Sequence, residues 1–421
     1  MQLAYGQDQI EFTPDSRVQW QVLNRPGSAA EQVAAVEPAI DRLSAMIRER
    51  IAGAGARLLL VIPDHTRRCR VDEILRRLLA GLEVLDSPVI HILVANGSHV
   101  LQPESTVRDL VGADIYERYE VRQHDSQDQA SLHYFGRTDY GTPVYLNSLV
   151  RDADVVVTIG GILFHYFAGF GGGAKMLLPG VAGYETIRVN HRRTIDEAGA
   201  HFHSGCREGL LDGNPVYMDL AQVDNMVPDV LSLQVVLNPQ KEFVFAQAGP
   251  MLAVHRQACQ IVKSTYSVAI PARADVVVAS AGGFPSDVNL IQSHKSIHHA
   301  FRAVKPGGVL LMLAECREGI GSKTFMSAIA AGDSAAIGRY LLTNYVINGQ
   351  TALALKAKAE QVQIHLVSGL DPDIVKQAGL VAHDSLAHAW QAIQAGLPAG
   401  ATGYIFPKAS VYLPVMESKD E

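Results

Sequence analysis

The sequence lacks the features of membrane, secreted and disulfide-bonded proteins. It has only two tryptophans and four cysteines in 421 residues. The cysteines (Cys69, Cys206, Cys259 and Cys316) show no paired spacing, which is typical of reduced thiols in a cytoplasmic protein. No apolar run approaches the ~18 residues of a membrane span. A secretion signal consists of a basic region followed by an apolar stretch, and residues 1–6 show no such pattern. We therefore expect a cytoplasmic protein with no membrane partner.

Charge is also scarce, because Asp, Glu, Lys and Arg make up 19% of the residues. The net charge of 36 − 43 = −7 argues against a nucleic-acid partner, which usually requires a basic surface. The hydrophobic fraction of 48% excludes a disordered chain. At roughly 150 residues per domain, the length predicts two to three domains. Glycine is abundant, with 36 residues, and its clustering favours backbone packed closely against ligands.

Apolar patterning predicts an α/β fold. Strands are expected at 58–62, 89–95 and 155–159, with helices at 71–82 and 103–110 between them. Strands that alternate with helices form a mostly parallel sheet. Ligands of such sheets bind beyond the carboxyl ends of the strands, which is where the loops after these three strands lie.

The alternation restarts late in the chain. We expect strands at 274–280, 309–313 and 364–367, and helices at 290–304, 351–362 and 386–395. The sequence therefore predicts two α/β domains with mostly parallel sheets and a cleft between them. Residues 1–270 would form the first domain, completed by the tail 404–421, and 271–403 a smaller second domain.

A glycine-rich segment between residues 164 and 191 carries the densest chemical signal. Three consecutive glycines (Gly171, Gly172, Gly173) precede Lys175, so the backbone there can approach a phosphate or a flat cofactor. The spacing matches neither a Walker loop nor a dinucleotide fingerprint. From these residues alone, a flexible glycine loop with a solvated lysine is equally plausible.

Three histidines stand out by position. His99 and His165 follow predicted strands, and imidazole is the natural proton acceptor near neutral pH. A single loop histidine is more often without function, but two of them with a Gly-Lys loop beside one favour acid/base chemistry. His191 is either a surface residue or a metal ligand, since imidazole suits nickel, zinc and copper.

Three further groups have alternative interpretations. Asp64, Thr66 and Arg67 form either a phosphate clamp or a helix cap with solvated arginine. Gln292 and Lys295 share one helix face, which either binds a carboxylate or is simply exposed. The remaining group, His201, His203 and Cys206, resembles a zinc site but has no second cysteine pair to support it.

Together these motifs resemble the lactate racemase family, the nickel-pincer 2-hydroxy-acid racemases and epimerases. The resemblance runs from Pro63 to Phe325, with five separated motifs in the family's order. It implies the following site: Asp64, Thr66 and Arg67 on the cofactor phosphate, Gly171, Gly172 and Gly173 against the cofactor, His99 and His165 as catalytic acid/bases, Lys175 joined covalently to the cofactor, His191 on nickel, and Gln292 and Lys295 on the substrate carboxylate.

The implied cofactor is a nickel-pincer nucleotide, pyridinium-3-thioamide-5-thiocarboxylic acid mononucleotide with nickel, made by separate maturation enzymes that would be partners of this chain. The implied reaction inverts C2 of a 2-hydroxy acid by hydride transfer. Ile291 stands where a tyrosine commonly precedes the glutamine, which puts lactate itself in question. A sugar-acid C2 epimerase is the alternative within the family. Outside it, a metal-dependent hydrolase and a non-catalytic binder of phosphorylated ligands remain open.

Overall fold

The computed structural model describes residues 1–24, 33–51, 53–67, 69–227 and 229–417. Its described residues form two compact units. Those within 29–193 and 205–265 make up one, here called the central unit, and those within 1–28, 194–204 and 266–421 make up the other, the terminal unit. Each contains its own six-stranded sheet, which confirms the predicted α/β class.

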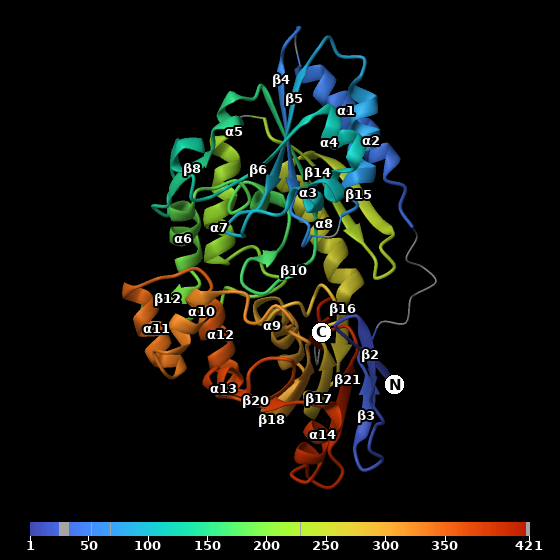
Figure 1. Cartoon of the computed structure of the whole chain (residues 1–421), viewed down its shortest axis with the longest axis vertical. Helices are drawn as coiled ribbons and strands as arrows, with labels where there is room; N and C mark the ends of the chain where they lie inside the picture. The colour runs from blue at the N-terminus through green and yellow to red at the C-terminus, as the bar shows by residue number, and fades with distance from the viewer. Residues whose placement is uncertain (25–32, 52, 68, 228, 418–421) are drawn as a thin grey trace. The chain divides into compact units, whose positions relative to one another are not determined.

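The central unit is built on a sheet with strand order β15-β14-β9-β4-β5-β6. Figure 1 labels the strands of this sheet except β9. All neighbours are parallel except β14 and β15. The strands are β4 (Arg57–Pro63), β5 (Val89–Ala95), β6 (Glu120–Gln123), β9 (Val155–Gly161), β14 (Leu231–Leu237) and β15 (Phe243–Pro250). The chain runs outward from β4 to one side and from β9 to the other, so strand order reverses between them. Such a reversal is where doubly wound sheets bind ligands.

Alternating side chains of β4 face two layers. Leu58, Leu60 and Ile62 belong to a core shared with helices α1 and α2, each of which buries one apolar stripe. The opposite face of β4 contacts the short helix η2 (Gly173–Met176), which carries the glycine loop. The helices of this unit are α1 (Glu37–Arg50), α2 (Val71–Leu82), α3 (Glu104–Val111), α4 (Ala113–Arg118), α5 (Ser148–Asp152), α6 (Tyr184–Arg192), α7 (Pro215–Ala221) and most of α8 (Met251–Tyr266).

Two antiparallel hairpins complete the described strands of the central unit. One pairs β7 (Leu132–Arg137) with β8 (Pro143–Asn147), and the other pairs β10 (Phe164–His165) with β11 (Gly169–Phe170). The second hairpin matters for function because it leads directly from β9 into the glycine loop.

The terminal unit has an all-parallel sheet of order β20-β19-β18-β17-β21-β3. Its strands are β3 (Gln19–Val22), β17 (Ala274–Ser280), β18 (Val304–Leu313), β19 (Gln363–Val367), β20 (Val381–His383) and β21 (Thr402–Phe406). The helices are α9 (Leu290–Phe301), α10 (Lys323–Ile329), α11 (Ser334–Thr343), α12 (Gly349–Ala359), α13 (Pro372–Gln377) and α14 (Leu386–Gln394). Smaller pairs join β1 (Gln2–Tyr5) to β2 (Asp8–Glu11), β12 (Ile195–Asp196) to β13 (His201–Phe202), and β16 (Ser267–Ile270) to β22 (Leu413–Met416).

The two units differ from the expected domain boundaries at both ends of the chain. The tail was expected to complete the first domain, but β21 lies inside the terminal sheet between β17 and β3. The N-terminal segment joins the same sheet through β3, where Trp20 packs against Phe12 and Trp390 with ring centroids 5.6 and 5.5 Å apart. Backbone pairing and this aromatic cluster therefore bind both segments to the terminal unit. The last residues of the tail, 418–421, lie outside the described residues.

Two local boundaries also differ from expectation. Helix α9 ends at Phe301, three residues before the expected end. The segment 305–308, expected to interrupt the chain between helix and strand, is included in β18 with an irregular register against β17. None of the helices in the described part of the chain is long and apolar enough to cross a membrane.

Candidate active site

His99 and Asp64 meet at the carboxyl edge of the central sheet. Asp64 directly follows β4, and His99 lies in the loop after β5. The sheet register pairs Pro63 with Ala95, which brings the two following loops side by side. The Nδ1 atom of His99 lies 2.6 Å from Oδ2 of Asp64. The His99 side chain keeps 38% of its surface exposed, whereas that of Asp64 keeps 4%.

The second carboxylate oxygen of Asp64 is also occupied. Its Oδ1 accepts hydrogen bonds from the Thr66 amide at 3.0 Å and from the Thr66 hydroxyl at 2.5 Å. Burial opposes ionisation of Asp64, but the hydrogen bond and charge of His99, with help from Arg67 and Thr66, hold its pKa well below the usual value. Asp64 is therefore an ionised, buried acceptor. The exposed Arg67 side chain has no hydrogen bond or ion pair within the described residues.

The glycine loop is held from both sides by its own unit. Gln234 on β14 accepts a hydrogen bond from the Gly173 amide at 3.1 Å, and Nε2 of His255 on α8 lies 3.0 Å from the Gly171 carbonyl oxygen. Gly172 and Gly173 have φ values of +66° and +55°. An added Cβ would lie 2.2 Å from Ile162 at the first and 2.4 Å from His255 at the second, so both must be glycine. At Gly171 an added Cβ would meet nothing closer than 3.8 Å, which leaves room there for a ligand.

Lys175 extends from this loop toward the ring of Phe167. Its ammonium lies 5.1 Å from the centroid of the Phe167 ring. Among the residues that the structure describes, its amine makes neither a hydrogen bond nor an ion pair. Burial, reinforced by the charge of Arg67, lowers the pKa of Lys175 from 10.5 to about 7. A substantial fraction of the amine is therefore neutral, and hence nucleophilic, at physiological pH.

This shift predicts that Lys175 reacts with electrophiles at unusually low pH. Because the folded state disfavours the ammonium, the neutral amine dominates above about pH 7. In competitive labelling of the apoprotein with trace acetic anhydride, modification of Lys175 should be half-maximal near pH 7. The other lysines serve as internal controls, and Arg67→Gln should move the Lys175 midpoint upward. A Lys175 profile that coincides with those of exposed lysines would contradict the assignment.

Phe167 brings three of the predicted residues together. The centroid of its ring lies 4.5 Å from that of the His165 ring and 4.9 Å from that of the His191 ring, in addition to its contact with Lys175. His165 is 9% exposed, and its Nδ1 accepts a hydrogen bond from the Ala168 amide at 3.3 Å. In the neutral ring this bond places the proton on Nε2.

His191 is oriented by the residue that precedes it. Asn190 donates through Nδ2 to the Val216 carbonyl at 3.1 Å and to Asp219 at 2.9 Å. Its Oδ1 therefore faces Nδ1 of His191, at 3.1 Å, and accepts a hydrogen bond from the N–H group at that position. The lone pair is left on Nε2. Burial, together with the charge of Lys175, lowers the pKa of His191 to about 3, so the ring is neutral and suited to a metal.

The predicted substrate residues lie in the terminal unit. Gln292 and Lys295 occupy one face of α9, as expected from their spacing, and Nζ of Lys295 donates to Oε1 of Gln292 at 2.6 Å. The amides at the start of this helix are already bonded, since Leu290 donates to Gly319 and Gln292 to the side chain of Asn289. Any anion at this face would therefore be held by Lys295 rather than by the helix terminus.

The suspected zinc cluster is not assembled. Cys206 is buried in the central unit, where its Sγ lies 3.6 Å from the Arg193 carbonyl oxygen and burial raises its pKa to about 12. His201 and His203 belong to the terminal unit. The described residues contain no group of three or more His, Cys, Asp or Glu side chains placed to hold a metal ion.

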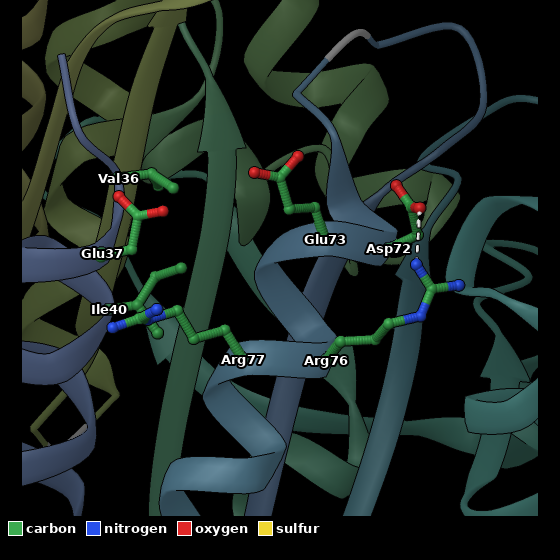
Figure 2. Close-up of a pocket in the computed structure, with 7 residues that line it drawn as sticks. All are labelled: Val36, Glu37, Ile40, Asp72, Glu73, Arg76 and Arg77. Atoms are coloured by element: carbon green, nitrogen blue, oxygen red, sulfur yellow. Dashed lines mark hydrogen bonds and ion pairs between the residues drawn. The ribbon is translucent and has the colours of Figure 1, made fainter.

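A separate cavity of about 520 Å³ lies between α1 and α2 (Figure 2). No predicted site residue lines it. Its arginines are paired within the protein, with Arg76 at 3.1 Å from Asp72 and Arg77 at 3.1 Å from Asp41. The cavity therefore adds nothing to the site at the carboxyl edge of the sheet.

Three supporting residues were not predicted from sequence. Phe167 lies within the glycine-rich segment between residues 164 and 191. The aromatic residues beside it in the sequence are the one signal that could have marked it as part of the site. Gln234 and His255 are 61 and 84 residues from the loop atoms that they contact. No motif marks them, so only the pairing of β14 with β9 and the packing of α8 reveal their part.

The fold is a doubly wound α/β sheet, and a lysine of lowered pKa and two oriented histidines lie at its carboxyl edge, where proteins of this class bind ligands. Sequence models of the lactate racemase N-terminal and C-terminal domains match residues 5–202 and 270–353. Lactate racemase of Thermoanaerobacterium thermosaccharolyticum is 30% identical over 332 residues, 77% of this chain and 76% of that protein. Lactate racemase of Lactiplantibacillus plantarum is 32% identical over 288 residues, 68% of this chain and 66% of that protein.

Solved structures agree at the level of the fold. The lactate racemase apoprotein of T. thermosaccharolyticum superposes with a TM-score of 0.84 at 23% identity, covering 98% of this chain and 99% of that one. A protein of Thermotoga maritima superposes with a TM-score of 0.71 at 16% identity, covering 91% of this chain and 99% of that one. The chain belongs to the lactate racemase family. Racemases are isomerases, so this membership places the chain among the isomerases.

Proposed function

We propose that this protein is a 2-hydroxy-acid racemase or epimerase that uses a nickel-pincer nucleotide. The observation that carries the proposal is the environment of Lys175. An amine with a pKa of about 7 and no polar partner in the described chain lies on the same aromatic ring as His165 and His191. A lysine built to attach a group covalently, beside an imidazole built to ligate a metal, fits a cofactor that requires both.

The residues present fit such a nucleotide. Lys175 would hold it covalently through a thioamide, Nε2 of His191 would ligate its nickel, and Gly171 leaves room for it beside the loop. Arg67 has the chemistry to bind its phosphate, because guanidinium forks onto phosphate oxygens. When bound, the pyridinium ring of the nucleotide can accept a hydride from C2 of the substrate. Dedicated maturation enzymes would be needed to supply this nucleotide to the chain.

The protein's own groups handle the proton and the carboxylate. His99 is proposed to take the hydroxyl proton of one stereoisomer and His165 that of the other, so that loss of C2–H leaves a 2-keto acid without forming a carbanion. For His165 this requires release of the 3.3 Å hydrogen bond from the Ala168 amide, so that its proton moves to Nδ1 and the lone pair to Nε2. Lys295 and Gln292 are proposed to bind the substrate carboxylate. If the keto acid rotates before C2–H is restored, the configuration inverts.

The function is tested by assaying cofactor-loaded protein for interconversion of the stereoisomers of 2-hydroxy acids, with lactate and longer and sugar-derived acids in one panel. We expect inversion at C2 of at least one of these acids. Activity on sugar acids alone would favour the epimerase alternative, which sequence alone does not separate from a racemase of small 2-hydroxy acids. No inversion by protein that carries a Lys175 adduct and nickel would contradict the proposal.

Replacement of His191 tests the proposed nickel ligand. Because Asn190 fixes the ring with the proton on Nδ1 and His191 is the proposed nickel ligand, His191→Ala should lose nickel more readily than the wild type during dialysis against a chelator. Nickel content would be measured by elemental mass spectrometry and folding by circular dichroism. His203→Ala is the matched control, because that histidine lies in the other unit. Equal nickel retention by both variants would assign the ligand elsewhere.

A further inference from the structure

The contacts of Asp64 do not match those of a residue that binds a cofactor phosphate. Its side chain is 4% exposed, and each carboxylate oxygen already accepts a hydrogen bond from the chain, Oδ1 from Thr66 and Oδ2 from His99. An ionised carboxylate also repels a phosphate of the same charge. Arg67, by contrast, is exposed and carries the charge that a phosphate needs.

We propose that Asp64 is a positioning residue that fixes the tautomer and orientation of His99. An ionised carboxylate can only accept, so the 2.6 Å contact requires the proton of His99 to be on Nδ1. The lone pair is then on Nε2 of a side chain that keeps 38% of its surface exposed. The inference rests on the proposed acid/base role of His99 for its effect on activity, but the tautomer itself is a property of the apoprotein.

Thr66 makes the arrangement directional. The Thr66 amide can only donate, so the atom of residue 64 that faces it must be an acceptor. In Asp64→Asn the side-chain oxygen would therefore take the Thr66 side, and the NH₂ group would face Nδ1 of His99. That NH₂ group would donate to Nδ1 and move the ring proton to Nε2, where it blocks proton acceptance. Thr66 thus determines which way the amide is placed.

A second histidine–carboxylate pair provides a matched control. On the neighbouring strands β5 and β6, Nδ1 of His91 lies 2.9 Å from Oε2 of Glu120. This pair joins the same kinds of side chain in the same unit and includes no proposed site residue, although the described residues give Nδ1 of His91 no hydrogen bond. Glu120→Gln therefore changes a carboxylate to an amide beside a histidine without touching His99.

The test reads the tautomer directly in apoprotein labelled with ¹⁵N-histidine, at about pH 9, above the ordinary histidine range. Multiple-bond ¹⁵N–¹H spectra distinguish the two tautomers, and His99→Gln identifies the His99 signals. We expect Nδ1–H in the wild type and in Glu120→Gln, and Nε2–H in Asp64→Asn. Nε2–H in the wild type, or no change in Asp64→Asn, would overturn the proposal even if no variant is ever loaded with cofactor.

Loaded protein separates positioning from cofactor binding. Asp64→Asn should retain the Lys175 adduct and nickel, while kcat falls by up to about 10⁴-fold, the loss that the same change causes in a serine protease triad. Loss of adduct and nickel from Asp64→Asn, with the His99 tautomer unchanged, would make Asp64 a cofactor ligand and overturn the proposal. Failure of wild-type protein to carry an adduct would refute the proposed function but leave the tautomer result standing.

Discussion

Lys175→Ala is expected to abolish both covalent cofactor attachment and activity. The amine is the only group at this position that can form the bond, and its lowered pKa gives it a neutral, nucleophilic form near pH 7. Intact-protein and peptide mass spectrometry should find an added mass on Lys175 in loaded wild-type protein and none in the variant. Racemase activity should fall below detection.

Lys175→Arg is the informative companion variant. It keeps a cation over the Phe167 ring but cannot be neutral at pH 7, so it should behave like the alanine variant and not like the wild type. Lys263→Ala, which removes another lysine that lies over an aromatic ring in the same unit, should load normally. A fully loaded Lys175→Ala protein, or an active sample without nickel, would refute the assignment.

Replacing either of the proposed catalytic histidines, His99 or His165, is expected to slow racemisation in both directions. A reversible inversion uses both groups in each cycle, so His99→Ala and His165→Ala should each lose on the order of 10²-fold or more in kcat, the usual scale for a general base. Initial rates from each stereoisomer give the measurement.

The cofactor content of His99→Ala and His165→Ala must be measured as a control for their loss of rate. Both variants should keep the Lys175 adduct and nickel, because neither histidine is proposed to hold the nucleotide. His133→Ala, on the hairpin formed by β7 and β8, should leave the rate unchanged. A rate loss that merely follows loss of nickel would remove these histidines from the acid/base role.

The sequence was most informative where strands are buried on both faces. Strand β5 has the predicted bounds, and β4 and β9 extend the predicted ones by one or two residues, because buried parallel strands appear as continuous apolar runs. Strand β14 was not predicted, because the buried polar residues Ser232 and Gln234 interrupt its apolar run. Helix α1 has a clear apolar stripe in Ile40, Leu43 and Ile47, and its spacing would have allowed a prediction.

The site could be predicted as a set of residue types but not as a set of contacts. Motif order marked Lys175 and His191, yet their low pKa values arise from burial, which depends on how the loop folds over β4 and β9. The contact between His99 and Asp64 depends on the register that pairs Pro63 with Ala95, and no local pattern encodes that register. Likewise, Asp64 carries the residue type of a family motif, but its hydrogen bonds are directed to its own chain.

The fate of the C2 hydrogen tests the central claim most directly. A racemase that removes C2–H as a proton exchanges it with solvent, whereas hydrogen transferred as hydride in a water-poor site does not exchange. The hydroxyl proton handled by His99 or His165 exchanges freely and carries no information. With substrate deuterated at C2 and loaded enzyme in ordinary water, the account predicts that the opposite stereoisomer retains its deuterium. Early and extensive loss of deuterium from the product would contradict it.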